Sequence, residues 1–448
     1  MSTTLDRSRW RPLHTRILLA LGVGWALDAF EIQIVGSVIK PIATRFALSA
    51  TDQTVWVWVV WFAGLMLGAL VFGYIADRVG RRKLFVATLV LYSIAAILTA
   101  SSWSFGSFLA FRFLTALGVG GEYSAVSSAI AEFMPARRRG RTNALVMNFW
   151  SVGGIVAGLV GILFVSAVLG ASGWRYAFLF GAVSAAYGLY ARRLIPESPR
   201  WLASKGRLAE ADDVIERITG EPGDASNYDT RELQGDMRTH LAELWRDHRS
   251  KLMFGMALDF SEAAAYYGLF TFLPVFVLTR GVVNVGAGTV PYYYVVANIG
   301  GLGGGLLVSW TLDRFGRKPT VFASYTAAAA SVLVVAVAAK SGSPLWTLVA
   351  VTIAVFCASC AWMSAYPTFS ELFPTHLRAT GVGVCVAFGR IGAILGVVML
   401  AETATSFGLW TAFLSLSGLW LIGSVASVVW WSRGIEGRGQ TLEALAHA

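Results

Sequence analysis

The sequence predicts an all-α membrane protein whose twelve transmembrane helices form two six-helix bundles of matching design. Three observations predict this fold: an apolar composition, a regular series of apolar stretches and an internal duplication. Hydrophobic residues make up 56% of the 448 residues and charged residues only 14%, whereas a soluble protein carries about 25% charged residues. This composition is typical of a chain that lies mostly inside a bilayer.

Apolar stretches of about 20 residues recur along the chain, and a helix of that length crosses the roughly 30 Å of hydrocarbon in a bilayer. The first stretch contains Asp28 and Glu31 and lacks a small-residue cleavage site, so we expect it to be a helix of the protein and not a signal peptide. The predicted spans are residues 17–41, 53–76, 84–101, 105–133, 141–168, 174–195, 251–279, 288–311, 320–340, 345–370, 379–404 and 408–431.

Two charged phrases occur once in each half of the chain. D-R-V-G-R-R-K at residues 77–83 returns as D-R-F-G-R-K-P at residues 313–319. E-F-M-P-A-R-R-R at residues 132–139 returns as E-L-F-P-T-H-L-R at residues 371–378. The two halves therefore repeat almost in register. Two facing copies of a helical bundle can build a site at mid-depth that opens to either side of the membrane.

The duplication predicts four parts of the chain. Residues 1–195 form the amino-terminal six-helix bundle, residues 196–250 a cytoplasmic linker with short helices, residues 251–432 the carboxy-terminal six-helix bundle, and residues 433–448 a cytoplasmic tail. A break rich in Gly, Pro and Asn at residues 220–227 divides the linker. The linker is either a solvated tether or a latch across the bundles, and we favour the latch.

The net charge of +10 is unevenly distributed over the predicted loops. Arg112 and Arg390 lie inside helices, and 29 of the 36 Lys and Arg residues lie on the side of the amino terminus. Because basic loops stay in the cytoplasm, both termini are predicted to be cytoplasmic. Topology thus explains the basic excess, and we expect no nucleic-acid partner. The basic residues on the other side are Lys40, Arg45, Arg175, Arg280 and Lys340.

The three cysteines, Cys357, Cys360 and Cys385, all fall within apolar helices. The first two have C-x-x-C spacing, but no histidine or second cysteine pair accompanies them as a metal site would require. We therefore interpret them as small packing residues. No nucleotide-binding loop, metal cluster or nucleophile–base arrangement is present in the sequence, so we expect no cofactor, no metal and no enzymatic activity.

Ionisable residues at membrane depth are costly, so each is a candidate functional residue. Asp28 and Glu31 lie on one face of the first predicted helix because they are three residues apart, and Arg112 is the nearest cation. Asp259 and Glu262 repeat this spacing in the seventh helix. Glu122 lies in the G-V-G-G-E-Y run of the fourth predicted helix. It either lines the cavity or caps a neighbouring backbone.

Arg390 is the residue that points to a substrate. It lies about 18 Å along its helix from Arg378, at a rise of 1.5 Å per residue, in an apolar and glycine-rich segment. A guanidinium there needs an anion, which comes either from Asp259 or Glu262 or from a bound substrate. Its planar fork suits a carboxylate.

Aromatic and amide side chains in the predicted helices could surround this cation. Aromatic faces with a few placed donors describe a pocket for a flat carboxylate. Any single aromatic residue could instead face lipid or the core, so we expect a cage built from several of them. The candidates are Trp61, Asn148, Trp150, Tyr266, Tyr267, Asn298, Trp362, Tyr366 and Phe388.

The D-R-x-G-R-R loop, its repeat and the phrase P-E-S-P-R-W-L at residues 196–202 together resemble the major facilitator superfamily over nearly the whole chain. They are most similar to its sugar porters, organic ion carriers and bacterial metabolite–proton symporters. In such carriers, charges at the cytoplasmic helix ends lock the outward-open state. The matching gating residues are Asp77, Arg81, Glu132 and Arg139 in one half and Asp313, Arg317, Glu371 and Arg378 in the other.

The resemblance to proton-coupled sugar porters implies an Asp–Arg pair between the first and fourth helices, matching Asp28 and Arg112. Aromatic-acid symporters have two acids spaced by three in the first helix, which matches Asp28 and Glu31. A carboxylate that switches between a neutral buried state and an ionised paired state couples proton entry to substrate entry. The alternative is a static pair that fixes two helices. The proton-coupling candidates are Asp28, Glu31, Arg112, Glu122, Asp259 and Glu262.

The string F-G-R-I-G at residues 388–392 resembles the helix-eleven site of organic ion carriers, where a basic residue is typical of anion carriers. Arg390 therefore implies an organic anion. The seventh helix lacks the paired glutamines of sugar porters, and the tail lacks their P-E-T-K-G ending, which argues against hexoses. Among bacterial members, the chain is most similar to niacin (nicotinate) permeases, followed by hydroxybenzoate symporters.

The resemblance implies proton-coupled import of a small organic anion, such as the aromatic monocarboxylate nicotinate, by alternating access. The expected location is the bacterial inner membrane, and the expected partners are the substrate, protons and lipid, with the protein as a monomer. Two alternatives remain open: a sugar or multidrug carrier of the same superfamily, and a receptor that binds ligand without transport.

Overall fold

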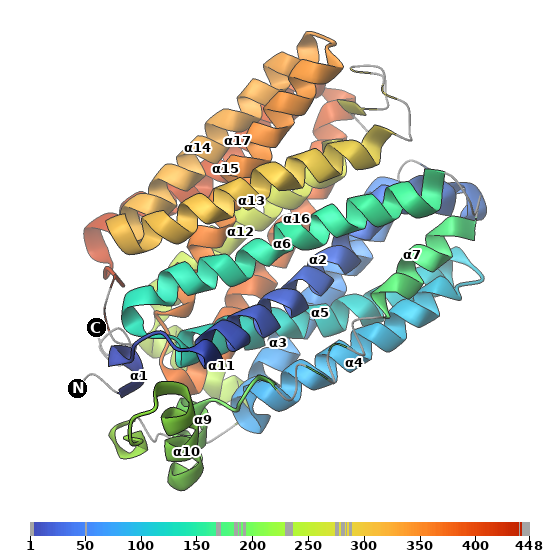
Figure 1. Cartoon of the computed structure of the whole chain (residues 1–448). Helices are drawn as coiled ribbons and strands as arrows, with labels where there is room; N and C mark the ends of the chain where they lie inside the picture. Colours follow the sequence, from blue (N-terminus) through green and yellow to red (C-terminus); the bar gives the residue numbers. More distant parts are fainter. Residues whose placement is uncertain are drawn as a thin grey trace.

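The computed structural model describes residues 4–440 with several gaps. The residues outside the described part are 1–3, 50–51, 167–171, 183–186, 188–189, 191–193, 229–235, 274–276, 279–282, 284, 286–288, 439 and 441–448. Long helices dominate the described part, and nine of them are long and apolar enough to cross a membrane. The predicted fold class, two six-helix bundles with a helical linker, is confirmed (Figure 1).

The helices of the first half follow the predicted spans. A short helix, α1 (Thr4–Arg7), precedes them. Much of the second half of the span predicted at residues 174–195 lies outside the described residues. The helices are α2 (Pro12–Phe46), α3 (Val57–Val79), α4 (Arg81–Ala100), α5 (Phe105–Phe133), α6 (Arg139–Ser166) and α7 (Gly173–Gly181).

The second half repeats this series after the linker. The linker contains α9 (Pro199–Ser204), α10 (Leu208–Thr219) and α11 (Met237–Asp247). Several residues at the end of the span predicted at residues 251–279 are not described. The helices of the second half are α12 (Arg249–Phe272), α13 (Val290–Phe315), α14 (Arg317–Lys340), α15 (Pro344–Ser370), α16 (Arg378–Ser406) and α17 (Leu409–Arg433).

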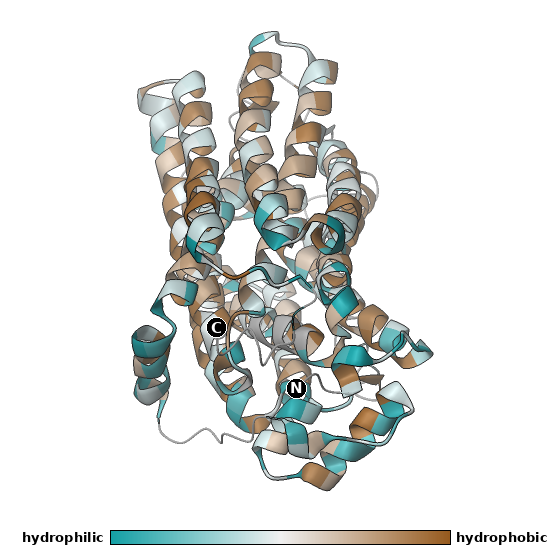
Figure 2. Ribbon diagram, turned by 90° about the vertical axis from the view of Figure 1, so that its left-hand side faces the viewer, coloured by the Kyte–Doolittle hydropathy of each residue, from teal (hydrophilic) through white to brown (hydrophobic). Residues whose placement is uncertain are grey.

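Helices α1, α9 and α10 lie at the same end of the molecule as the end of α17 (Figure 1). Hydrophilic residues gather on the short helices at this end, whereas hydrophobic residues dominate the long helices (Figure 2). The long helices expose large apolar side chains such as Leu163, Ile94 and Val337. A surface of this kind suits lipid and would be unfavourable in water.

Small residues let the helices approach closely at matching places in the two halves. In the first half, α6 meets α2 where Gly153 lies against the carbonyl of Ala26. In the second half, α16 meets α12 where Gly396 lies against the carbonyl of Ala264. A Cβ added at Gly396 would lie only 2.4 Å from that carbonyl oxygen and would clash with it. Close packing of this kind holds helices together in lipid.

The two halves also contact each other through long helices. Helix α6 packs against α13, and α3 packs against α16. The interface between the halves therefore runs through the centre of the molecule, where the predicted candidate residues of α6, α12, α15 and α16 are buried, except for the half-buried Phe388.

The turns before α4 and α14 are built in the same way. Gly80 and Gly316 occupy them with φ of 105° and 96°, a region that residues with a Cβ rarely adopt. Each turn leaves the first amides of the next helix without intrahelical partners. Carboxylates from distant segments accept these amides: Glu197 binds the first amide of α4 at 2.9 Å, and Glu436 binds that of α14 at 2.8 Å.

Candidate functional site

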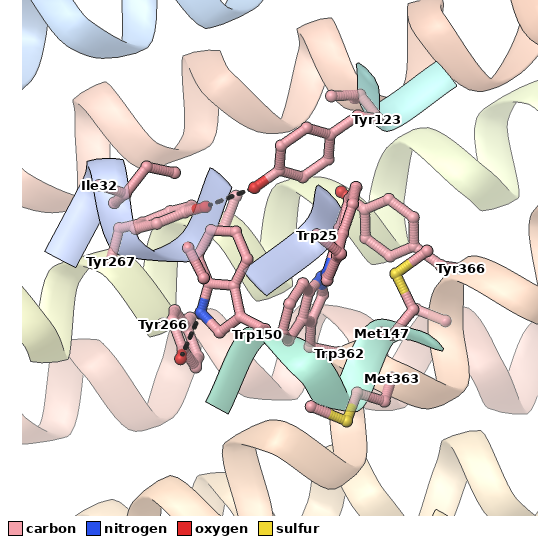
Figure 3. Packing of buried hydrophobic residues seen from close by; sticks show 14 of the residues in the cluster. Trp25, Ile32, Tyr123, Met147, Trp150, Tyr266, Tyr267, Trp362, Met363 and Tyr366 are labelled. Carbon is pink, nitrogen blue, oxygen red and sulfur yellow. Dashed lines mark hydrogen bonds between the residues drawn. The ribbon is translucent and has the colours of Figure 1, made fainter. Parts of the chain in front are cut away.

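The centre of the molecule contains one guanidinium among aromatic rings. Arg390 on α16 has an exposed fraction of 0% and donates a hydrogen bond from Nη2 to the hydroxyl of Tyr366, at 3.2 Å. Its guanidinium carbon lies 4.9 Å from the ring centre of Tyr123 and 5.3 Å from that of Tyr267. Both distances suit cation–π attraction, which strengthens when the cation is removed from water. The two tyrosine hydroxyls lie 3.2 Å apart (Figure 3).

The hydrogen-bonding capacity of Arg390 is largely unused. Nε and Nη1 have no hydrogen-bond partner among the described residues, and no ion pair joins the guanidinium to a described carboxylate. A guanidinium presents five N–H donors in a rigid fork. Buried donors without partners are costly, so this arrangement is suited to an acceptor that arrives from outside.

Asp259 interacts electrostatically with Arg390 but forms no ion pair with it. Its carboxylate lies directly against Gly389, so closely that a Cβ on that glycine would clash with it. Neither carboxylate oxygen has a hydrogen bond of normal geometry to a described residue. Glu262, one turn further along α12, is also buried and interacts with Asp259.

Four further aromatic residues pack beside the tyrosines that contact Arg390 and extend them into an aromatic cage (Figure 3). Trp150 of α6 donates to the hydroxyl of Tyr266 at 3.1 Å and meets Trp362 of α15 edge-on, with ring centres 4.9 Å apart. Trp25 of α2 lies 4.6 Å from Tyr123 and stacks on Trp362 at 6.3 Å. Both halves of the molecule therefore contribute walls to one aromatic cage.

The cage is closed. The small cavity beside Trp150, Tyr266 and Tyr267 has a volume of only about 10 Å³, which is about the space of one water. On one side of this cavity, Asn298 of α13 donates to the side chain of Gln33 of α2 at 2.9 Å and joins the two halves. A ligand the size of an aromatic acid therefore enters only if the halves move apart or the rings rearrange.

The predicted pocket residues divide into two groups. Trp150, Tyr266, Tyr267, Trp362 and Tyr366 belong to the cage around Arg390, and Asn298 lies at its margin through Gln33, which lines the small cavity. The remaining three lie elsewhere.

Trp61, Asn148 and Phe388 make other contacts. Trp61 lies under the guanidinium of Arg112, 3.8 Å from ring centre to guanidinium carbon. Asn148 donates to the carbonyl of Leu302 at 3.0 Å across the two halves. Phe388 packs against Phe260, 5.6 Å away.

Sequence reasoning left Tyr123 and Trp25 out of the cage. Tyr123 follows Glu122 directly in the G-V-G-G-E-Y run, and Trp25 lies one helical turn before Asp28. The spacing of Trp25 from Asp28 was an available signal, because residues three apart share one face of a helix. Tyr123 had no such signal, because adjacent residues of a helix point to different faces.

The buried charges of the first half differ from the predicted pairing. Arg112 pairs with Glu31, at 3.3 Å, and also donates to the backbone carbonyl of Glu31 at 2.9 Å, so the expected Asp28–Arg112 pair is wrong in this structure. Asp28 is instead a neighbour of Glu122 and Tyr92, with which it interacts. The physical reason is reach: Glu31 lies one turn further along α2, closer to the turn of α5 that carries Arg112.

The predicted gating charges form a buried network at the linker end of the helices. Arg81 lies 2.9 Å from Asp77 and 3.2 Å from Glu132. Glu132 also binds Arg378 of the other half at 3.1 Å. Asp77 accepts hydrogen bonds from the amide and hydroxyl of Thr380 on α16, at 2.8 and 2.7 Å.

The matching charges of the second half form a similar cluster. Arg317 lies 2.9 Å from Glu371 and 3.5 Å from Asp313. Asp313 also accepts the amide of Arg141 from the first half, at 3.3 Å. Because both clusters contact the opposite half, this end of the molecule is closed.

Arg139 and Arg378 have partners that the resemblance did not imply. Arg378 crosses to Glu132, and Arg139 binds Asp6 of α1 at 2.6 Å. Asp6 also binds Arg200 of α9, at 3.2 Å. The amino-terminal helix α1 thus supplies a carboxylate to this cluster that was not among the predicted gating residues.

Glu197 connects the linker to this network. It lies between α9 and the first turn of α4, where it accepts the amides of Arg81 and Ser198 at 2.9 and 3.1 Å. Burial raises the pKa of the Glu197 carboxyl, and the amide hydrogen bonds and the charge of Arg81 oppose this shift. Trp201 of α9 adds a hydrogen bond to the carbonyl of Asp77, at 2.9 Å.

No group of three or more metal-ligating side chains occurs in the described ranges of the chain. Arg390 presents unused donors inside an aromatic cage, the acids at the centre are buried, and the charged clusters join the two halves at the linker end. The arrangement contains no pairing of nucleophile and base among the residues discussed.

The comparisons with known proteins agree with this geometry. The family model described as Major Facilitator Superfamily matches residues 21–397. The niacin transporter NiaP of Acinetobacter baylyi is 29% identical over 437 residues, covering 96% of each chain. A provisionally described niacin/nicotinamide transporter of Bacillus subtilis is 29% identical over 423 residues, covering 94% of this chain and 96% of the other.

Among solved structures, the proton:xylose symporter XylE has a similar fold. Its TM-score is 0.79 at 19% sequence identity, covering 97% of this chain and 98% of the other. At that identity the likeness concerns the fold alone.

Proposed function

Since the chain belongs to the major facilitator superfamily and is a multi-pass membrane transporter and not an enzyme, we propose that it imports a small aromatic monocarboxylate together with protons. Nicotinate is the proposed example. Alternating access would carry the anion from one side of the membrane to the other as the two halves rock about the central site.

The single observation that carries this proposal is the buried Arg390 with unused donors inside an aromatic cage. A carboxylate would accept two parallel hydrogen bonds from the guanidinium fork. A flat ring attached to it would stack among Tyr123, Trp150 and Trp362. Two relatives named for niacin transport support an aromatic acid of this size.

Proton coupling is supported by the charge balance at mid-depth. Two guanidiniums, Arg112 and Arg390, face five carboxylates among the described residues, and an unpaired buried charge is expensive. We expect some of the acids to hold protons in the closed state and to release them when water reaches the site. The five carboxylates belong to Asp28, Glu31, Glu122, Asp259 and Glu262.

The orientation follows the distribution of basic loops. We propose that the end carrying the gate clusters, α1 and the linker faces the cytoplasm, because most Lys and Arg residues lie there. The bacterial relatives favour the inner membrane. We propose a monomer, since one chain holds both halves of the site.

The experiment that tests this function compares a charged ligand with a neutral ligand of similar shape, and adds a second aromatic acid and a sugar. Purified protein would be titrated with nicotinate and nicotinamide, which share the pyridine ring, and with benzoate and xylose. We expect heat of binding from nicotinate and benzoate and none from nicotinamide or xylose. Equal binding of nicotinate and nicotinamide would remove the anion from the proposal, and binding of xylose alone would favour a sugar carrier.

A further inference from the structure

We propose that a second cavity, on the outside of the first bundle, binds an anionic phospholipid. It lies between the start of α4 and the linker helices α9 and α10, and its volume is about 740 Å³. Neither Arg390 nor the aromatic cage lines it, so it is separate from the transport site. Figure 1 places the two linker helices at the end of the molecule where α4 begins.

The rim of this cavity is basic. Arg82 and Lys83 from the first turn of α4 meet Arg207 and Arg217 from the linker. A phosphodiester is the anion that such a rim would attract at a membrane surface, where each Lys or Arg adds about 1 kcal/mol of attraction to anionic lipid.

Two of the three acids that line the cavity are already engaged by the protein. Glu197 accepts backbone amides at the start of α4, and Glu210 accepts two hydrogen bonds from Arg207, at 2.7 and 2.5 Å. Asp213 is the third acid. Lys83 and Arg217 have no ion pair with a described residue, so their charges remain available to a phosphate.

The floor of the cavity is apolar and continues along the membrane-facing side of α4. Val86, Ala87 and Val90 line the cavity. Ile94 and Ile97 follow at helical spacing, with exposed fractions of 55% and 42%. Residues three and four apart share one face of a helix, so this stripe offers a path for an acyl chain below the phosphate.

The basic rim and the apolar stripe together indicate a ligand with an anionic head group and an acyl chain. A free phosphate would satisfy the rim but leave the apolar floor in contact with water. A zwitterionic lipid would cover the floor and bring a phosphodiester, but the cationic amine of its head group would be repelled by the charges of Lys83 and Arg217. An anionic glycerophospholipid satisfies both at once, and the surrounding bilayer supplies it.

Lipid in this cavity would act on the gate. Glu197 and Trp201 line the cavity and also bind the gate segment, Glu197 at the amide of Arg81 and Trp201 at the carbonyl of Asp77. A lipid that fills the cavity would therefore brace α9 against α4 and favour the closed gate.

The test measures lipid binding directly. Purified full-length protein would be titrated with phosphatidylglycerol, phosphatidylethanolamine or phosphatidylcholine of the same acyl chains, and with glycerol phosphate, using native mass spectrometry. We expect preferential binding of phosphatidylglycerol. The double variant Lys83→Gln/Arg217→Gln should lower its affinity by roughly tenfold or more.

The control is the double variant Arg137→Gln/Arg238→Gln. It removes the same charge from two exposed positions that do not line the cavity, and it should leave phosphatidylglycerol binding unchanged. Equal binding of all three lipids, equal loss in both double variants, or tight binding of glycerol phosphate without lipid would each overturn the proposal. Because nicotinate is absent from the assay, failure here would not touch the transport proposal.

Discussion

Arg112 and Arg390 are both fully buried guanidiniums, but their surroundings give them different roles. Arg112 is satisfied by the carboxylate and carbonyl of Glu31 and by the face of Trp61. Arg390 has one hydrogen bond, to the hydroxyl of Tyr366, and two nitrogens without partners. A satisfied cation fixes helices, whereas one with free donors can select a ligand.

Arg390→Lys should weaken binding of an aromatic carboxylate by roughly 10- to 100-fold, because an ammonium cannot form the paired hydrogen bonds of a guanidinium. Calorimetric titration of the purified variant measures the change. Arg314→Lys, at an exposed surface position on α13, is the control and should bind as the unaltered protein does. An unchanged dissociation constant for Arg390→Lys would remove this residue from the site.

Asp28→Asn should abolish proton-driven accumulation of substrate and leave exchange across the membrane less affected. The variant keeps the shape of the buried side chain but cannot gain or lose a proton, and its neighbour Glu122 would lose an acid partner. Uptake into vesicles with and without a pH gradient separates the two activities. Normal concentrative uptake by Asp28→Asn would end its proposed coupling role.

Gly389→Ala should impair binding because the new Cβ would displace the carboxylate of Asp259 beside Arg390. Overpacking of a dense core costs about 1–3 kcal/mol. Gly418→Ala on α17 is the matched control, since no atom lies close to its added Cβ. Thermal unfolding and ligand titration of both variants should show a loss for Gly389→Ala only; equal behaviour would contradict the assigned contact.

At this scale, sequence reasoning identified the central cation and most of its cage but not the pairing of the charges. Depth along a helix follows from the rise per residue, so Arg390 could be placed near mid-depth. Whether Arg112 meets Asp28 or Glu31 depends on the rotation and tilt of two helices, which no single sequence specifies. Trp61, Asn148 and Phe388 lie outside the cage for the same reason.

The proposed gate is built from whole helices and the turns between them. The turns between α3 and α4 and between α13 and α14 each bring an arginine at a helix start against acids from a neighbouring helix. Cross-connections join the halves at Glu132–Arg378 and at Asp77–Thr380. Opening of this end must break them together.

Glu132→Gln should therefore favour opening of the gate. It removes the charge that Arg81 and Arg378 share, and loss of one partner from a buried ion pair typically costs about 3–5 kcal/mol. Spin labels at the gate ends of α5 and α16 would report a longer distance distribution. Asp247→Asn, which breaks an exposed pair with Arg246, should leave the distances unchanged.

Unchanged distances in Glu132→Gln would show that the ion pairs do not hold the two halves together. If neither variant changes the distances, helix packing alone keeps this end of the molecule closed.

The elements themselves were predictable because apolar stretches of membrane length leave few alternatives to helices. The repeated charged phrases also fixed which helix ends meet. The role of Glu436 was not predictable from the family resemblance, since the tail departs from the expected P-E-T-K-G phrase. The repeat itself indicated this role: Glu436 lies 239 residues after Glu197, and the same offset separates the phrases that begin at Glu132 and Glu371.

As a whole, the molecule is closed around its centre. The charged clusters close the linker end, and the Gln33–Asn298 hydrogen bond joins the halves on the other side of the cage. Further along α2, Gly36 approaches the hydroxyl of Tyr294 of α13. A carrier must pass through such a state between its two open forms, and the cavity of only about 10 Å³ beside Trp150 fits a closed state.

The most direct test of the account is uptake of labelled nicotinate into vesicles that contain only this protein, with an imposed pH gradient that is acidic outside. The account predicts accumulation above the external concentration, collapse of that accumulation when a protonophore removes the gradient, and no uptake of nicotinamide or xylose. Accumulation of xylose or nicotinamide under the same gradient, or no uptake of nicotinate at all, would contradict it.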